Sequence, residues 1–255
     1  MARVKNPPAR TLTSEGRAFL RQRAGGDRGV DASGRMVWHD PGMQHAFGMA
    51  VPESVAEMCQ PSRAAVVVYD AQVGILAHVR RRAALLTQIR KVVDAARGAG
   101  VPVVYVRHVS VSPSHMGVGA LRMAMAWQRA ERAEDVRSSF PHAASDTQLV
   151  DELKPAAGEP VFDKLGMSAF VGTPLEVVLR DRGVITLILV GAVLEIGIEP
   201  TARHAADLGF LPVVVEDACG VVEPTAAERS LASLDYSLMS YRATTAEIVD
   251  ALSAT

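Results

Sequence analysis

From residue 64 onward, short apolar runs alternate with longer segments in which apolar residues recur at helical spacing. The run Ala64-Ala-Val-Val-Val-Tyr69 is continuously apolar and rich in β-branched residues, which is typical of a strand buried on both faces of a sheet. Between His78 and Gly98, one helical face carries Leu85, Ile89, Val92 and Ala96. This spacing predicts an amphipathic helix that ends at Gly98 or Gly100.

Four more apolar runs predict four more strands. They are Val101-Pro-Val-Val-Tyr-Val106, Pro160-Val-Phe162, Val184–Val190 and Leu211–Val215. Residues 109–150 between them are less regular, and we interpret their methionines (Met116, Met123 and Met125) as core filler or a pocket wall.

Three segments carry the capping-box pattern, in which a hydroxyl residue is followed three positions later by an acid. They are Thr173–Glu176, Thr225–Glu228 and Thr244–Glu247. They predict helices that begin near residues 174, 226 and 245, and Pro174 suits a first helical position because its missing N–H costs nothing there. Strands that alternate with helices predict an α/β fold, with three α/β/α layers and a mainly parallel, Rossmann-like sheet.

The first 61 residues differ from this pattern. Positions 1–35 carry eight Lys and Arg against three acids, and glycines near residue 25 break any long periodicity. We therefore predict an N-terminal basic arm over residues 1–61, with one short helix around Thr13–Arg23, and an α/β domain over residues 62–255. A tail that lies on its own domain or on a neighbouring subunit is favoured over a nucleic-acid arm, because basic and aromatic residues do not interleave.

Composition narrows the classes of partner. The 255 residues hold 27 Lys and Arg against 28 Asp and Glu, so charge gives no reason to expect nucleic acid or an anionic membrane. The longest apolar run, Val184–Leu194, is about half of a bilayer span. The first eight residues lack the apolar stretch of a signal peptide, which predicts a cytoplasmic location. Two cysteines, Cys59 and Cys219, are too few for a disulfide framework or a Cys-rich zinc site.

Candidate chemistry lies at the carboxyl ends of the predicted strands, where open parallel sheets bind ligands. The first strand ends at Asp70, the second at His108, the third at Lys164, and the fourth at the loop Gly191–Gly197. An acid and a base at such positions can shift one another's pKa values and transfer protons. The alternative is a structural ion pair at the sheet edge. Spacing alone predicts a small-molecule site that contains Asp70 and Lys164.

Residues Lys164 to Leu175 identify a resemblance. They read Lys-Leu-Gly-Met-Ser-Ala-Phe-Val-Gly-Thr-Pro-Leu, which resembles the Lys-x-x-x-Ser-Ala-Phe-x-Gly-Thr-x-Leu signature of the isochorismatase-like (cysteine hydrolase) superfamily. Other blocks of that family are similar to Tyr69–Gln72, Gly191–Ala202, Ala205–Gly209 and Glu216–Ala218. The resemblance covers about residues 62–250 and implies the isochorismatase-like hydrolase fold.

The resemblance also implies a mechanism, from which this chain departs. In the family, a Cys after the fourth strand attacks an amide or similar carbon, an Asp acts as its base, a Lys assists, and backbone N–H groups hold the oxyanion. A cis peptide of the same loop would map to Val193–Leu194. The nucleophile position is Gly197 here. Cys59 and Cys219 lie outside this block, so thiol-dependent amide hydrolysis is disfavoured.

Isochorismatases proper carry Gly at this position and cleave a vinyl ether, with an Asp as the acid that protonates carbon. By this resemblance Asp70 would be the acid, Lys164 would hold a substrate carboxylate, and Gly197 would leave room for the ring. Their Gly-Val-Tyr-Ala-His loop is replaced here by Gly191-Ala-Val-Leu-Glu195, and their Trp-Arg-Tyr by Leu165-Gly-Met167. We therefore expect a small carboxylate- or amide-containing substrate other than isochorismate.

The catalytic set predicted in this way is Asp70, Lys164 and Gly197. The predicted substrate contacts are Gln72, His108, Phe170, Val193, Leu194, Glu195 and Ile198. Three of them have open alternatives: Gln72 contacts substrate or ties down a loop, His108 faces the pocket or is an ordinary strand-end residue, and Glu195 complements a helix dipole or replaces a catalytic acid or base.

We expect neither a metal nor another cofactor. The zinc-dependent nicotinamidases of the family use an Asp and two His after the first strand. In the stretch that directly follows Asp70 here, the one histidine is His78, which lies too early and alone. The family resemblance implies a homodimer or homotetramer. Two other functions remain open: a binding or scaffold member that has lost catalysis, and a cysteine amidohydrolase whose nucleophile has been replaced at residue 197.

Overall fold

A computed structural model describes residues 28–30, 36–38 and 44–254. The chain divides into two compact units, Met1–Ser54 and Val55–Thr255. The first contains two antiparallel strand pairs, β1 (Arg28–Val30) with β2 (Met36–Trp38) and β3 (Gln44–Ala46) with β4 (Met49–Val51). The described part of the predicted arm thus contains two antiparallel strand pairs, which we did not predict. The helix predicted around Thr13–Arg23 lies outside the described residues.

The second unit is built on a six-stranded sheet with the order β10-β9-β8-β5-β6-β7, in which every neighbouring pair is parallel. The strands are β5 (Ala64–Tyr69), β6 (Val103–His108), β7 (Val161–Lys164), β8 (Thr186–Ala192), β9 (Leu211–Gly220) and β10 (Tyr241–Ala243). The order runs one way from β5 to β7 and the other way from β8 to β10. The carboxyl ends of β5 and β8 therefore form the crevice where such sheets bind ligands.

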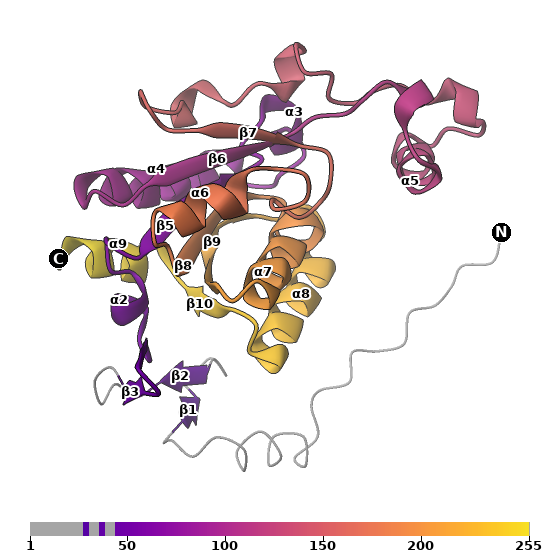
Figure 1. The fold of residues 1–255 in the computed structure, drawn as a ribbon. Helices are drawn as coiled ribbons and strands as arrows, with labels where there is room; N and C mark the ends of the chain where they lie inside the picture. Colours follow the sequence, from indigo (N-terminus) through magenta and orange to yellow (C-terminus); the bar gives the residue numbers. More distant parts are fainter. Residues whose placement is uncertain (1–27, 31–35, 39–43, 255) are drawn as a thin grey trace, which may run out of the picture. The chain divides into compact units, whose positions relative to one another are not determined.

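Helices cover both faces of this sheet, which confirms the three-layer α/β/α prediction (Figure 1). The core on one face includes residues of α2 (Val55–Met58), α4 (Arg82–Gly98) and α9 (Thr245–Ser253). The core on the other face includes residues of α6 (Leu175–Asp181), α7 (Glu199–Asp207) and α8 (Pro224–Ser237). Along β5, Val66 and Val68 belong to the first core, whereas Val67 and Tyr69 belong to the second, as strand alternation requires.

The predicted helices form with some changes at their starts. A short helix, α3 (Val73–Leu76), precedes α4, which begins at Arg82 rather than His78. The α9 capping box is present, because Thr244 and Glu247 each accept from the other's backbone N–H. The box expected at Thr225 is wrong, since α8 begins at Pro224 and the Glu223 side chain caps it.

The irregular segment before β7 contains α5 (Val118–Gln128) and four 3₁₀ turns, η1 (Pro113–His115), η2 (Ala133–Asp135), η3 (Ser145–Thr147) and η4 (Asp151–Leu153). No residue of α5 is buried, and the helix stands away from the sheet (Figure 1). Met116, Met123 and Met125 are not buried either. The interpretation of these methionines as core filler is therefore wrong.

The second unit begins at Val55, before the predicted domain start at residue 62. Met58 and Cys59 are buried in the core around α4 and α9. Within the described ranges, the structure has no helix with the length and apolar character of a membrane span.

Candidate active site

The carboxyl ends of β5 and β7 bring Asp70 and Lys164 together. Lys164 pairs with His108 in the parallel register of β7 and β6, and its side chain crosses the end of β6 to reach Asp70. Lys164 Nζ lies 2.9 Å from Asp70 Oδ2, and it also donates to the Gly166 carbonyl at 3.3 Å. Both side chains are buried, with 0% and 7% of the Lys164 and Asp70 side chains exposed. The pair thus lies inside the protein, beside the crevice where the strand order reverses.

Burial dominates the electrostatics of this pair. It raises the pKa of Asp70 to about 6, although the Lys164 ammonium acts in the opposite direction. Burial also lowers the pKa of Lys164, against the effect of the Asp70 carboxylate. The second carboxyl oxygen, Asp70 Oδ1, is buried and has no hydrogen-bond partner in the described part of the chain. Asp70 therefore has one oxygen held by Lys164 and one available to a proton or a ligand.

Gln72 ties neighbouring strand ends together. Its amide donates to the carbonyls of His108 at 2.9 Å and Thr147 at 2.8 Å, and its oxygen accepts from the His108 N–H at 2.7 Å. Gln72 is completely buried, so these contacts favour the loop-tying alternative. The His108 ring packs edge-on against Phe140. Burial and the Lys164 charge lower the pKa of His108 to about 4, which leaves the imidazole neutral near pH 7.

The loop after β8 contains the non-proline cis peptide that the family resemblance implies, but one residue earlier. It joins Ala192 and Val193, not Val193 and Leu194. A π-helical turn, η5 (Leu194–Ile198), follows and leads into α7. The Val193 carbonyl accepts from the N–H groups of Gly197 at 2.9 Å and Ile198 at 3.1 Å. These two N–H groups of the loop therefore bond to the loop itself.

The Glu195 carboxylate bonds to backbone N–H groups near α8, whereas a replacement catalytic acid would face the Asp70–Lys164 pair. Its Oε1 accepts from the N–H groups of Val222 at 2.9 Å and Glu223 at 2.7 Å. These two residues immediately precede α8, so Glu195 holds the loop to the start of that helix. Its Oε2 is buried without a hydrogen-bond partner within the described residues.

The other predicted contacts lie in the cores rather than on an open wall. Phe170, Leu194 and Ile198 are buried in the core around α6, α7 and α8, whereas Val193 is buried in the core on the opposite face. The Phe170 ring stacks on Phe210 and packs against His204, whose Nδ1 lies 2.9 Å from Ser168 Oγ.

Tyr69, which we did not predict as a site residue, fills the space beside Gly197. An ideal Cβ at Gly197 would lie 2.1 Å from the Tyr69 hydroxyl oxygen and 2.4 Å from Cζ, far inside any non-bonded contact. The ring lies under the Lys164 ammonium, with Nζ 4.3 Å from its centroid, and the hydroxyl donates to the Met167 carbonyl. The available sequence signal was an aromatic residue directly before Asp70. The empty nucleophile position is therefore occupied by another residue's side chain.

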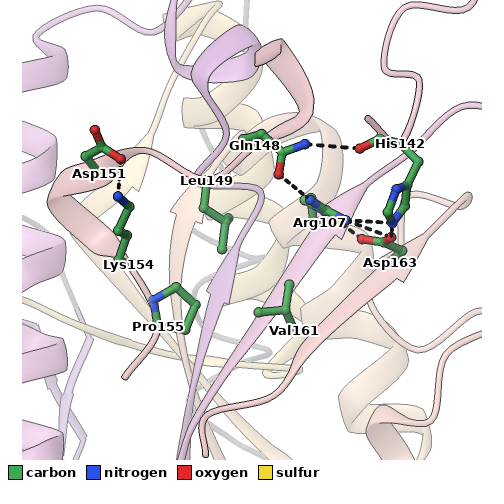
Figure 2. A pocket seen from close by; sticks show the side chains of 9 residues that line it. All are labelled: Arg107, His142, Gln148, Leu149, Asp151, Lys154, Pro155, Val161 and Asp163. Carbon is green, nitrogen blue, oxygen red and sulfur yellow. Dashed lines mark hydrogen bonds and ion pairs between the residues drawn. The ribbon is translucent and has the colours of Figure 1, made fainter. Parts of the chain in front are cut away.

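A surface groove of about 640 Å³ lies on the β6 and β7 side of the sheet (Figure 2). Its charged groups pair with one another: Arg107 holds Asp163 through two bonds of 2.7 and 2.9 Å, and Lys154 Nζ lies 2.8 Å from Asp151. None of the predicted site residues lines this groove, because strand alternation directs Arg107 and Asp163 away from the face of His108 and Lys164. The groove is thus separate from the candidate site.

Neither cysteine replaces the missing nucleophile. Cys59 and Cys219 are both buried, and burial raises the pKa of Cys59 to about 12 and that of Cys219 further. Within residues 28–30, 36–38 and 44–254, no group of three or more His, Cys, Asp or Glu side chains is arranged to hold a metal ion.

Comparison with known proteins gives matches of three kinds: related sequences, solved structures and a family model. The sequence is 29% identical over 153 residues to a ureidoacrylate amidohydrolase RutB of Pseudomonas savastanoi pv. phaseolicola (strain 1448A / Race 6), across 57% of this chain and 62% of that protein. It is 30% identical over 189 residues to the RutB of Rhizobium rhizogenes (strain K84 / ATCC BAA-868), across 66% of this chain and 74% of that protein. The chain thus spans less than two thirds of the first relative's length.

Among solved structures, a cysteine hydrolase from Pseudomonas syringae pv. phaseolicola 1448A is 27% identical, with a TM-score of 0.65 over 76% of this chain and 94% of that one. The N-carbamoylsarcosine amidase of Thermoplasma acidophilum shares the fold, with a TM-score of 0.56 at 23% identity over 72% of this chain and 96% of that one. The model of the isochorismatase domain matches residues 64–248. These residues include the whole sheet with both members of the buried Asp70–Lys164 pair, and the chain therefore belongs to the isochorismatase family.

Proposed function

We propose that this chain is an isochorismatase-like hydrolase that acts on a small carboxylate- or amide-containing metabolite by Asp70 and Lys164 chemistry, without a cysteine nucleophile. The observation that carries this proposal is the buried Asp70 carboxyl, whose Oδ1 has no partner within the described residues and whose pKa is raised to about 6. A carboxyl with such a pKa holds its proton at mildly acidic pH and can deliver it as a general acid.

The hydrogen bonds suggest separate roles for Asp70 and Lys164. Lys164 occupies Asp70 Oδ2, so Oδ1 is the oxygen that can hold and deliver the proton. An ammonium has three N–H donors, of which Asp70 and the Gly166 carbonyl take two. In the proposed mechanism, the third would donate to a substrate carboxylate. Lys164 would thereby orient the substrate while it keeps Asp70 Oδ2 occupied, so that the proton stays on Oδ1.

The proton would be transferred to carbon in an alkene that carries oxygen or nitrogen beside a carboxylate. The alkene π electrons form the new C–H bond with the Oδ1 proton, and the heteroatom lone pair stabilises the resulting cation. Water then adds to that cation and returns a proton to the Asp70 carboxylate. The adduct collapses to a carbonyl compound, and its hydroxyl proton goes to the leaving group, which departs as an alcohol from an enol ether or as an amide or urea from a nitrogen substrate. The name of the RutB relatives, ureidoacrylate amidohydrolase, supports a substrate that combines an acrylate with an amide-type nitrogen.

The test compares turnover by the wild-type chain, Asp70→Asn and Lys164→Met on small enol ethers and acrylate-linked ureas that carry a carboxylate. We expect Asp70→Asn to lower kcat/KM at least ~100-fold, which is the low end of what a general acid contributes. Asp163→Asn is the matched control, because Asp163 belongs to the separate surface groove. Wild-type activity should also fall as the pH rises above about 6. Turnover that survives Asp70→Asn unchanged would contradict the proposal.

A binding member without turnover is the second candidate. The observation that favours it is the bonding of the Gly197 and Ile198 N–H groups to the Val193 carbonyl, which leaves them unavailable to an oxyanion. This candidate predicts saturable binding of a small carboxylate, measured by calorimetry, with no turnover in any variant. Amidase activity that appears only after Gly197→Cys would instead indicate a cysteine amidohydrolase whose nucleophile has been replaced.

We also propose that the chain forms a homodimer or homotetramer. Its support is α5, which has no buried residue and exposes Val118 and Trp127, with 78% and 59% of their surface accessible. Light scattering would give the mass, and Trp127→Glu with Val118→Glu should lower it if α5 contacts another copy. A monomeric wild-type chain would contradict the proposal.

A further inference from the structure

We propose that Tyr69 is the residue that determines which chemistry this site can perform, because its side chain takes the volume that a nucleophile at position 197 needs. The inference depends on where the site lies and not on the acid role proposed for Asp70. It makes Tyr69 and Gly197 a coupled pair, in which the residue at one position limits what the other can be.

The packing around the Tyr69 ring carries the proposal. The three atoms closest to an ideal Cβ at Gly197 all belong to the Tyr69 side chain, the hydroxyl oxygen at 2.1 Å, Cζ at 2.4 Å and Cε1 at 2.5 Å. No backbone atom is among them. Only 2% of the Tyr69 surface is exposed, so the ring cannot swing into solvent to admit a larger residue. The nearest obstacle to a Cβ at residue 197 is thus the side chain of one residue, Tyr69.

The polar contacts of Tyr69 show what the ring does in its position. Its face lies 4.3 Å from Lys164 Nζ, and its hydroxyl donates to the carbonyl of Met167. Lys164 in turn holds Asp70 Oδ2. Tyr69 therefore separates the Asp70–Lys164 pair from position 197 and supports the ammonium through a cation–π contact.

The phenol itself is not a substitute nucleophile. Burial raises the pKa of Tyr69 well above its usual value, and the Asp70 charge raises it further. The hydroxyl consequently remains protonated, and a neutral phenol is a weak nucleophile. Tyr69 is therefore a positioning residue that keeps the site in its thiol-free form.

The primary experiment is a stability cycle with Gly197→Cys in two backgrounds. In the Tyr69 background, we expect Gly197→Cys to lower the Tm by at least about 5 °C, because the new Cβ overlaps the ring. In a Tyr69→Leu background, the same change should leave the Tm unchanged or raise it, because the thiol fills the space that the ring has left. Tyr69→Val serves in the same way if Tyr69→Leu does not fold.

Tyr69→Phe is the matched control, because it retains Cζ and Cε1, the ring atoms that the new Cβ would meet. Gly197→Cys should therefore destabilise the Tyr69→Phe chain about as much as the wild-type chain. If Gly197→Cys does not fold in the Tyr69 background, recovery of folded protein in the Tyr69→Leu/Gly197→Cys double variant supports the proposal equally. An equal loss of Tm in the Tyr69 and Leu backgrounds would overturn it.

The pH dependence of alkylation by iodoacetamide reports the pKa of the new thiol, which a purely steric role of Tyr69 would not change. The native cysteines are both buried and should react slowly. The thiol of the double variant is also at a buried position, but it takes the space of the ring whose centroid lies 4.3 Å from Lys164 Nζ, and mass spectrometry of the alkylated peptide isolates its reaction. Its rate should be half-maximal below about pH 8.5, the value for a free thiol, and Lys164→Met should move this midpoint upward. A midpoint at or above that value, or one that Lys164→Met does not move, would show that Tyr69 does not control this chemistry. Neither measurement uses a substrate, so a failure of the proposed hydrolase activity would leave both outcomes readable.

Discussion

Gly191 and Gly197 flank the same loop and exclude a side chain for different reasons. At Gly191, an ideal Cβ would lie 2.0 Å from the Tyr69 carbonyl oxygen and 2.7 Å from the Tyr69 carbonyl carbon, and the backbone φ is +124°. At Gly197, the obstructing atoms are those of the Tyr69 ring and hydroxyl. Tyr69 thus restricts both positions to glycine. Its backbone excludes a side chain at Gly191, and its own side chain excludes one at Gly197.

The difference separates what the fold requires from what one side chain requires. Tyr69 and Gly191 are partners in the parallel register of β5 and β8, so the close approach at Gly191 belongs to the central pairing of the sheet. No substitution at residue 69 can change the position of a backbone carbonyl. The contact at Gly197 exists only while residue 69 carries a large ring. A nucleophile at residue 197 is therefore excluded by the identity of residue 69. The glycine at residue 191 is required by the backbone of the sheet itself.

The largest effect we expect is that of Gly191→Ala. The overlap with backbone atoms and the positive φ together should cost at least ~4 kcal/mol in the free energy of unfolding, measured by urea denaturation. Tyr69→Leu should give no relief, in contrast to its effect at residue 197. Gly183→Ala is the control for φ alone, because Gly183 has a φ of +70° and nothing within 4 Å of its Cβ position. Relief of Gly191→Ala by Tyr69→Leu would remove the distinction between the two glycines.

The sequence predicts the parts of the fold that depend on local pattern. The apolar runs that became β5, β6 and β8, the buried face of α4 and the three layers all follow from periodicity. Strand β10 (Tyr241–Ala243) was missed because three residues are too few to show a period. The cap of α8 was misplaced because Glu223 competes with Thr225 for the same N-terminus, and pattern alone does not rank two adjacent caps.

The candidate site divides in the same way. Strand ends are readable in the sequence, so the meeting of Asp70 with Lys164 could be predicted. The contact of Tyr69 with Gly197 could not, because it depends on the direction of one ring between residues far apart in the chain. Gln72 and Glu195 were ambiguous for a related reason, since a buried polar side chain can bind a ligand or a backbone group, and only the hydrogen bonds distinguish these uses.

An effect of intermediate size is expected from the Asp70 carboxyl, which follows Tyr69, on the pH dependence of stability. Because the pKa of Asp70 is raised to about 6 in the folded chain, the folded state binds this proton more tightly than the unfolded state. The contribution of Asp70 to stability should therefore be greatest below about pH 4 and fall by on the order of 2–3 kcal/mol as the pH rises through about 6. Urea denaturation across this range should show the loss in the wild-type chain and a flatter profile in Asp70→Asn. The lowered pKa of Lys164 acts in the alkaline range and in the opposite direction.

Asp163→Asn provides the comparison for that profile, because Asp163 is partly exposed and paired with Arg107 in the surface groove. This variant should keep the wild-type loss between pH 4 and 6. If Asp70→Asn retained the loss as well, the buried carboxyl would not be its source.

The smallest effect should come from Tyr69→Phe, which removes the hydroxyl and keeps the ring. The lost hydrogen bond to the Met167 carbonyl should cost about 1 kcal/mol in the free energy of unfolding. The ring still fills the space at Gly197, so Gly197→Ala should be as destabilising in this background as in the wild-type chain. If Tyr69→Phe alone relieved Gly197→Ala, the obstacle would be the hydroxyl oxygen rather than the ring. Position 197 would then accept a side chain without loss of the aromatic residue, and the contrast with Gly191 would depend on a single atom.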